Sequence, residues 1–489
     1  MTKLPFDNSY ARLPEAFFAS VQPDEAPDPA LIRANTGLAE LLGLDADWVL
    51  SDEGLAMFSG KKLPAEAEPI AMAYAGHQFG GWVPQLGDGR ALLLGEVIAQ
   101  DGVRRDIQLK GSGKTPFSRD GDGKSALGPV LREYIVSEAM AALSVPTTRA
   151  LAAVTTGETV YRDGAQPGAV LTRVAQSHVR VGTFQYFFAR GDKQAVKTLA
   201  DYVITRHYPE VKQNKNPYKG LLKEIVERQA GLIAQWMSFG FIHGVMNTDN
   251  MQIAGETIDY GPCAFMDEFH PQKVFSSIDR NGRYAWINQP TIAQWNLTQL
   301  AETLLFLLAE DQDQAIKEAE DGLGIFNDLF SEHFSNAFCQ KLGLLENNEE
   351  HSVFIETTFR IMTENEVDFT LFFRHLTRVA AGESEEVLRS LFNNPTDCDE
   401  WLETWQKYMS QDKQEKENRV AIMRQKNPVF IPRNHRIEEA IQAALKEDYK
   451  PFNRLVDVLA NPFSEQPEHV ELEQQPEPDE VVHQTFCGT

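Results

Sequence analysis

Apolar and polar positions change their spacing about one third of the way along the chain. Between about 68 and 175, apolar runs at 91–98, 105–111 and 168–175 are separated by Gly, Asp and Pro, a pattern that predicts strands joined by turns. One segment in this region, 131–143, instead repeats its apolar residues at helical spacing. The first part of the chain is therefore predicted to be rich in strands and to contain one helix.

Beyond residue 180 the apolar positions recur at helical spacing over long segments. Residues 218–240 and 291–310 predict two long amphipathic helices, and Gly240 is a plausible end for the first of them. The chain up to about residue 460 continues mostly as helix with polar loops. A strand-rich half followed by a helical half predicts an α+β fold.

Composition narrows the class of protein. The 489 residues include 46 Lys and Arg against 71 Asp and Glu, a net charge of −25, which argues against a nucleic-acid partner. Four cysteines without a CxxC pair predict neither a disulfide scaffold nor a zinc ribbon. Because we find no signal or transit peptide and no apolar run long enough to cross a bilayer, we expect a cytoplasmic protein without a membrane partner.

Both ends of the chain differ from its middle. Residues 1–60 are of mixed character, and we expect them to form an extension that packs on the body of the protein. No Lys or Arg follows Arg454, and the last segment alternates acidic residues with Pro and Gln. Such a composition has little to bury, so residues 461–489 are predicted to form a disordered acidic tail.

Two glycine-bearing segments could approach a ligand closely. Gly87 and Gly89 flank Asp88 just before a predicted strand, and Arg90 follows with a guanidinium suited to phosphate, although a simple hairpin turn has the same signature.

The segment 106–128 is rich in Gly, Ser, Lys and Arg but is not a P-loop. Gln108 stands where that motif requires glycine, and no helix opens after its Gly-Lys-Thr.

Lys110 ends a predicted strand, and Glu133 lies 23 residues later on the following helix. Protein kinases use a strand lysine paired with a helix glutamate to hold a lysine against nucleotide phosphates. The spacing allows such a pair here, and two unrelated surface charges would show the same spacing.

The segment 241–262 is the most informative. His243 and Asn250 have the separation found in a kinase catalytic loop, and Asp259 begins an Asp-Tyr-Gly that stands in for the Asp-Phe-Gly motif. Amide and carboxylate oxygens at Asn250 and Asp259 are suitable ligands for Mg²⁺ bound to phosphates. Val245 replaces the aspartate that serves as base in kinases, and the nearest carboxylate is Asp249.

Long motifs spread over nearly the whole chain resemble the selenoprotein O family, kinase-like protein adenylyltransferases. They are NSYARLPEAFF, MAYAGHQFGGWVPQLGDGRALLLGE, IQLKGSGKTPFSRDGDGKSALGPVLREYIVSEAM, LTRVAQSHVRVGTFQYF, GFIHGVMNTDNM and NPVFIPRNHRIEEAI. Cys487 lies where some members of the family carry selenocysteine.

The resemblance implies roles for particular residues. It implies a nucleotide site formed by Gly87, Gly89, Arg90, Lys110, Asp122, Gly123, Arg173, Arg180 and Asp259. It also implies Asp249 as the proton acceptor, Asn250 and Asp259 as ligands of Mg²⁺ (with Mn²⁺ possible), and Glu133 as the ion-pair partner of Lys110.

The family is described as binding ATP in the reverse orientation relative to kinases. The α-phosphate then meets a Ser, Thr or Tyr hydroxyl of a target protein, AMP is transferred and pyrophosphate leaves. The implied fold is two-lobed and kinase-like, with a strand-rich N-lobe at 61–175 and a helical C-lobe at 176–460.

Three other functions remain open from the sequence. A kinase that transfers the γ-phosphate is disfavoured by Val245. A pseudokinase scaffold is disfavoured by the complete set of metal ligands and phosphate-binding cations. Transfer of UMP from UTP with manganese is so close in chemistry that the sequence does not rank it against AMP transfer.

Overall fold

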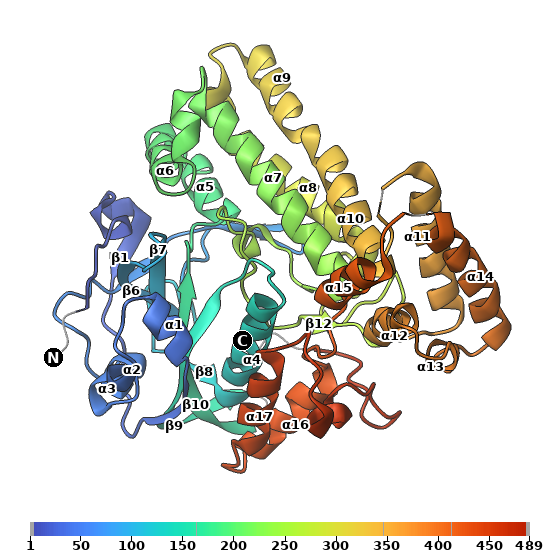
Figure 1. The fold of residues 1–489 in the computed structure, drawn as a ribbon. Coiled ribbons are helices and arrows are strands. Elements are labelled where there is room, and N and C mark those ends of the chain that lie inside the picture. The colour runs from blue at the N-terminus through green and yellow to red at the C-terminus, as the bar shows by residue number, and fades with distance from the viewer. Residues whose placement is uncertain (1–3, 163, 346, 412, 486–489) are drawn as a thin grey trace.

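The computed structural model describes residues 4–162, 164–345, 347–411 and 413–485, and at the centre of this described part lies an antiparallel sheet of eight strands (Figure 1). Seven strands follow the order β1 (Phe18–Ser20), β3 (Ile70–Met72), β6 (Ala91–Ile98), β7 (Arg104–Lys110), β10 (Gly164–Ala175), β9 (Arg149–Arg162) and β2 (Ala30–Ala34). The eighth, β8 (Ser125–Ala126), pairs with β10. The two edge strands, β1 and β2, come from the first 60 residues, so the sheet begins earlier in the chain than residue 61.

Side chains of the sheet alternate between two hydrophobic cores. Leu93 and Leu171 belong to the core shared with α4 (Leu127–Ala142), and their neighbours Leu94 and Val170 belong to the core shared with the N-terminal helices. Those helices are α1 (Thr36–Leu41), α2 (Ala46–Val49) and α3 (Asp52–Phe58). Because successive strand residues point to opposite faces, burial on both faces explains why the segment 91–98 has no polar face.

The helices predicted at 131–143, 218–240 and 291–310 are confirmed as α4, α7 (Pro217–Ser238) and α8 (Gln289–Leu308). The chain leaves α7 through Gly240, whose φ of 68° lies in the left-handed region that glycine tolerates. Helix α7 packs against α8, α9 (Gln312–Leu323) and α10 (Ile325–Leu342). Within the described residues, none of the helices combines the length and the apolar character that crossing a membrane requires.

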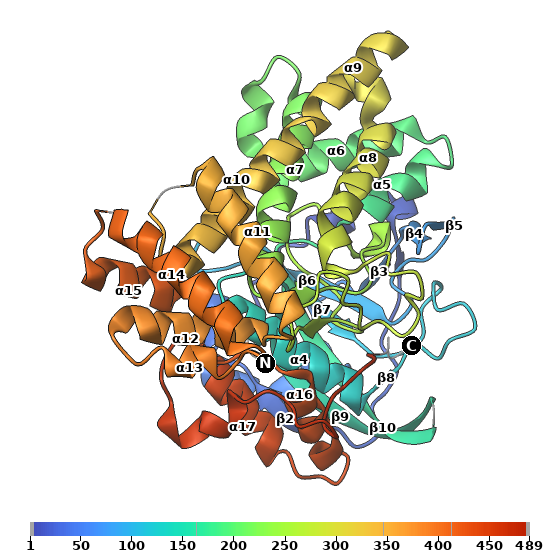
Figure 2. The ribbon, with the colours of Figure 1, turned by 90° about the vertical axis from the view of Figure 1, so that its right-hand side faces the viewer.

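The remaining helices of this half are α5 (Val181–Phe188), α6 (Lys193–His207), α11 (Glu349–Glu364), α12 (Phe369–Ala381), α13 (Glu386–Arg389), α14 (Pro395–Gln411) and α15 (Lys416–Lys426). The combination of a strand-rich sheet and many helices, on which the prediction of an α+β fold rests, is therefore confirmed. Figure 2 shows the long helices gathered on one side of the molecule and the sheet on the other.

The last two helices return to the sheet side and cover α4 (Figure 1). Phe452 of α17 (Lys450–Leu459) makes an edge-to-face contact with Tyr134 of α4, with ring centroids 5.6 Å apart. Asn434, the first residue of α16 (Asn434–Ala444), accepts a hydrogen bond at 3.2 Å from Arg132 of α4. Helix α4 is therefore held between the sheet and two C-terminal helices.

The prediction of a disordered acidic tail is wrong for residues 461–485, which pack on the body. Leu472 is buried, and the backbone of Thr485 pairs with Phe275 and Ser277. Composition alone missed this because the tail finds partners elsewhere in the chain, among them Arg374, which forms an ion pair with Glu465. Cys487 lies outside the described residues, and the other cysteines (Cys263, Cys339 and Cys398) are buried.

Arg433 connects three parts of the helical half. Its guanidinium is almost completely buried and forms ion pairs with Asp368, at 2.8 Å, and with Asp267. It also donates a hydrogen bond at 3.1 Å to the carbonyl of Glu473 in the acidic tail. Buried charges that are paired in this way become costly when one partner is removed.

We expect Arg433→Ala to lower the free energy of unfolding by about 3–5 kcal/mol, because the carboxylates of Asp267 and Asp368 would remain buried without their cation. Urea unfolding at pH 7 measures this loss. The control is Arg360→Ala, which removes an exposed i,i+4 pair with Glu364 and should cost no more than about 0.5 kcal/mol. Equal losses for the two variants would contradict the structural role of Arg433.

Candidate active site

A cavity of about 770 Å³ opens between the sheet and the segment that follows α7. All of the residues singled out for a nucleotide site line it: Gly87, Gly89, Arg90, Lys110, Asp122, Gly123, Glu133, Arg173, Arg180, Asp249, Asn250 and Asp259. These residues come from eight separate stretches of the chain, 87–90, 110, 122–123, 133, 173, 180, 249–250 and 259, so only the fold brings them together.

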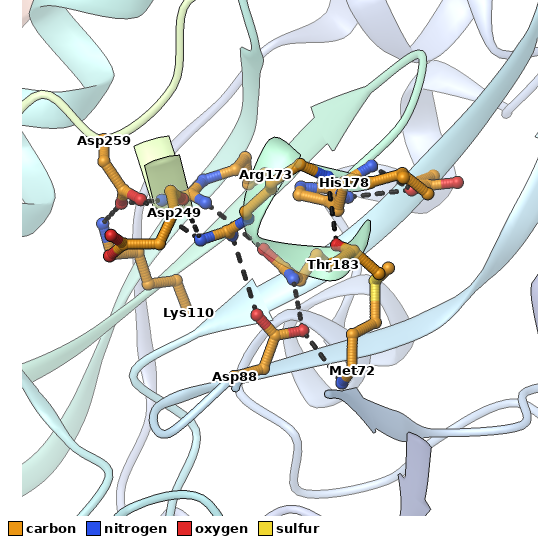
Figure 3. Close-up of polar contacts among 12 residues, drawn as sticks. Met72, Asp88, Lys110, Arg173, His178, Thr183, Asp249 and Asp259 are labelled. Carbon is orange, nitrogen blue, oxygen red and sulfur yellow. Dashed lines mark hydrogen bonds and ion pairs between the residues drawn. The ribbon is translucent and has the colours of Figure 1, made fainter. Parts of the chain in front are cut away.

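The floor of the cavity is a cluster of four charges, most of it buried. The Nζ atom of Lys110 lies 2.7 Å from Asp259 Oδ1, and Arg173 lies 2.9 Å from the same oxygen (Figure 3). Glu133 completes the cluster: its Oε2 lies 2.6 Å from Lys110 Nζ, and its Oε1 lies 2.6 Å from Arg173. Two cations therefore share two carboxylates.

The register of the sheet explains this cluster. Strands β7 and β10 are antiparallel neighbours, and Arg173 lies opposite Gln108. Lys110 is two residues beyond Gln108, so Lys110 and Arg173 project from the same face of the sheet. Glu133 meets them from α4, which covers that face, and Asp259 meets them from the segment that follows β11 (Phe241–Ile242).

The carboxylates of this cluster stay ionised. Burial alone would raise the pKa of Glu133, but Arg173 and Lys110 outweigh burial and lower it. Burial likewise opposes ionisation of Asp259, and Lys110, Arg173 and Arg180 together hold its pKa well below the usual range. The cluster is therefore a fixed array of charges and not a proton donor near neutral pH.

Arg180 extends this array toward the glycine-bearing turn. Its guanidinium lies over the ring of Tyr74, 4.3 Å from the centroid, and 3.7 Å from Asp88. It also donates a hydrogen bond at 2.9 Å to the backbone carbonyl of Asp249. Asp88, which was not singled out from the sequence, accepts a hydrogen bond at 3.1 Å from the backbone N–H of Met72. The only feature of the sequence that could have indicated Asp88 was its position between Gly87 and Gly89.

Asp249 lies in a 3-10 turn (Thr248–Asn250) and its side chain is held by a neighbouring hairpin. Gln78, on β4 (Gly76–Gln78), donates a hydrogen bond at 3.3 Å to Asp249 Oδ2. Oδ1 of Asp249 is buried and has no hydrogen-bond partner among the described residues. Burial, partly opposed by Arg180, raises the pKa of Asp249 to about 6. No motif or spacing in the sequence indicated the contribution of Gln78.

Asn250 and His243 have different surroundings. The side-chain amide of Asn250 donates a hydrogen bond at 3.0 Å to the carbonyl of Val245, so its own carbonyl oxygen is left for another partner. His243 is fully buried, stacks on Trp236 and is hydrogen-bonded through Nε2 to the carbonyl of Ile258. His243 therefore supports the loop and does not line the cavity.

The glycine-rich segment between β7 and β8 forms the outer wall. A Cβ atom at Gly123 would lie 2.0 Å from the carbonyl oxygen of Gly113, and one at Gly87 would lie 2.3 Å from the ring of Phe117. Asp122 forms an ion pair with Arg162 at 2.9 Å. This wall therefore depends on close backbone approaches that only glycine allows.

The described side chains offer a metal ion few ligands. Within the part of the chain that the structure describes, no three or more His, Cys, Asp or Glu residues gather in a way that could coordinate a metal. A cation in the cavity would therefore need oxygen ligands from outside the protein in addition to Asp259 and Asn250.

Comparison with known proteins gives one consistent result. A family model described as "Protein adenylyltransferase SelO" matches residues 1–460. The chain is 58% identical over 487 residues to the "Protein nucleotidyltransferase YdiU" of Rhodopseudomonas palustris (strain BisB5), with 99% of each chain covered. It is 56% identical over 491 residues to the protein of the same name from Rhizobium meliloti (strain 1021), with 100% of each chain covered.

We expect Gly123→Ala to destabilise the protein more than Gly102→Ala. The two glycines have similar φ angles, 71° and 79°, but nothing lies within 4 Å of a Cβ at Gly102. Gly102→Ala should therefore cost only the left-handed strain, about 1–2 kcal/mol, whereas Gly123→Ala must also displace the backbone at Gly113. Urea unfolding of both variants measures the difference. Equal losses would contradict the close approach.

Proposed function

Because the chain belongs to the family described as the protein adenylyltransferase SelO, the protein is a nucleotidyltransferase, and we propose that it transfers AMP from ATP to Ser, Thr or Tyr hydroxyls of target proteins. The observation that carries the proposal is the shared cavity in which the Lys110, Glu133, Arg173 and Asp259 cluster faces Asp249. The cavity therefore combines charges suited to binding a triphosphate with a carboxylate suited to accepting the proton of a hydroxyl.

We propose a two-lobed, kinase-like arrangement for this chain, with an N-lobe at 61–175 and a C-lobe at 176–460. The Lys110–Glu133 ion pair between a strand and a helix supports it, as does the order of α7, the Asp249–Asn250 turn and Asp259 along the chain. The order and the pairing are those of the kinase nucleotide site.

The phosphate chain would be bound by cations from the floor of the cavity and by Arg90 beside the glycine turn. Lys110, Arg173 and Arg180 carry the positive charge of the floor, and Arg90, Gly87 and Gly89 line the same cavity. Asp122 and Gly123 belong to the outer wall of the same site. Fixed donors of this kind stabilise developing negative charge without reorganising during the reaction.

Asp249 is the residue that would accept the proton. The hydroxyl oxygen of the target forms a bond to the α-phosphorus, its proton passes to Asp249, and the bond from the α-phosphorus to the β-phosphate breaks, so pyrophosphate leaves. This role is supported because Asp249 lines the cavity and because burial raises the pKa of its carboxyl to about 6, close to neutral pH. Val245, at the position of the kinase base, has no group able to accept a proton.

Asn250 and Asp259 fit a Mg²⁺ ion, and Mn²⁺ has the same donor preference. Asp259 remains a carboxylate, and the amide of Asn250 keeps its oxygen available because its nitrogen is committed to Val245. Two protein oxygens suit a cation that takes its other ligands from phosphates and water. When bound, the ion would supply positive charge to the phosphate oxygens.

Label transfer distinguishes AMP transfer from its alternatives. We expect protein-bound label from ATP labelled with ³²P at the α-position, none from γ-labelled ATP, and less from α-labelled UTP. The loss of label in Asp259→Ala would tie the transfer to this site. Label from the γ-position alone would identify a kinase and overturn the proposal, and preferred label from UTP would replace AMP by UMP.

We expect Asp249→Asn to lower kcat for transfer by about 10²–10⁴, because the amide is no longer able to accept the hydroxyl proton. ATP affinity, measured by calorimetry, should change little because the shape of the side chain is kept. Asp120→Asn, which removes an exposed carboxylate from the same cavity, serves as the control and should keep near wild-type transfer. If Asp249→Asn transfers AMP as fast as this control, Asp249 is not the base.

A further inference from the structure

The outer wall of the cavity carries a short tip between two anchors. On one side, Ser118 Oγ bonds to the carbonyl of Gly89, and on the other Asp122 forms a two-contact ion pair with Arg162. Between them the backbone N–H of Gly121 donates to the carbonyl of Ser118 at 2.8 Å, which closes a tight turn. Arg119 is the second residue of this turn, and it lines the cavity.

The conformation of Arg119 is one that glycine would adopt more easily. Its φ is 55°, and Asp120, the third residue of the turn, has no positive φ. Turns with a positive φ at the second residue alone are dominated by glycine at that position. Of the six non-glycine residues with positive φ in the described chain, three line the cavity: Phe79, Arg119 and Asp259. Strain of this kind is concentrated at functional sites.

The charges on the floor leave little net positive charge for a ligand. Lys110 and Arg173 share Glu133 and Asp259, and Arg180 faces Asp88. These three cations and three carboxylates cancel, yet a triphosphate brings several negative charges into the cavity. Further positive charge comes from other residues that line the cavity, among them Arg90 and Arg119.

Among the cations that line this side of the cavity, Lys124 and Arg162 are already paired, but Arg119 is available. Lys124 forms an ion pair with Glu158, and Arg162 is held by Asp122. Arg119 is exposed and forms neither a hydrogen bond through its guanidinium nor an ion pair with any residue in the described ranges. A guanidinium offers paired N–H donors that match the oxygens of a phosphate group.

We propose that Arg119 binds the phosphate chain of the nucleotide from the open side of the cavity, opposite the buried cluster. The inference rests on the proposed function for the identity of the ligand. It explains why an arginine occupies a position where glycine would be less strained, since glycine would carry no charge to the cavity. Because the Arg119 side chain has no partner among the described residues, binding a phosphate would not require it to break an existing interaction.

Calorimetric titration with ATP and with adenosine, in buffer containing Mg²⁺, tests this role in Arg119→Gly. The glycine suits the left-handed turn, so the melting temperature should stay the same or rise. We expect the Kd for ATP to increase about tenfold or more, because a charge-assisted contact is lost, and the Kd for adenosine to stay unchanged. Arg119→Lys should restore part of the ATP affinity.

Lys114→Ala is the matched control, because it removes one positive charge from an exposed residue of the same segment that does not line the cavity. An ATP affinity of Arg119→Gly equal to that of Lys114→Ala, or an equal loss of adenosine affinity, would overturn the inference. Calorimetry measures binding and not transfer, so the two proposals fail separately. A wild-type protein that binds ATP but transfers no AMP would overturn the proposed function. The role of Arg119 would still be decided by the titration.

Discussion

Two cations and two carboxylates at the floor of the cavity hold together the parts of the protein on which its chemistry depends. Lys110 and Arg173 come from neighbouring strands, Glu133 from α4 and Asp259 from the segment after β11. With most of the cluster buried, the loss of any one charge would leave a buried, unbalanced charge behind, so the sheet, the helix and the loop keep one arrangement. The same charges then face the space that a triphosphate would occupy.

The rest of the fold keeps this cluster and the cavity in place. Helix α4 packs between the sheet and the two C-terminal helices, so Glu133 has little freedom to move away from Lys110. The hairpin at Gln78 contacts the turn at Asp249, and glycines allow the outer wall to approach the backbone closely. Rigid support on several sides suits a reaction that relies on positioning and electrostatics.

The local parts of the site could be predicted from the sequence, and the parts that depend on distant contacts could not. Lys110 and Glu133 lie on a strand and a helix that follow each other in the chain, so their spacing in the sequence was enough to suggest the ion pair. Gln78 joins Asp249 across 171 residues, and no pattern in the sequence marks such a contact. The acidic tail was wrongly predicted to be disordered because composition does not reveal that Arg374 and Arg433 supply its partners.

The central claim concerns which phosphorus of the nucleotide meets Asp249, and a crystal structure with Mg²⁺ and a non-hydrolysable ATP analogue tests it most directly. We expect the α-phosphorus to lie nearest the Asp249 carboxylate, with the β- and γ-phosphates bound by the cations of the cavity. A complex in which the γ-phosphorus lies nearest Asp249, with the α-phosphate turned away, would contradict AMP transfer.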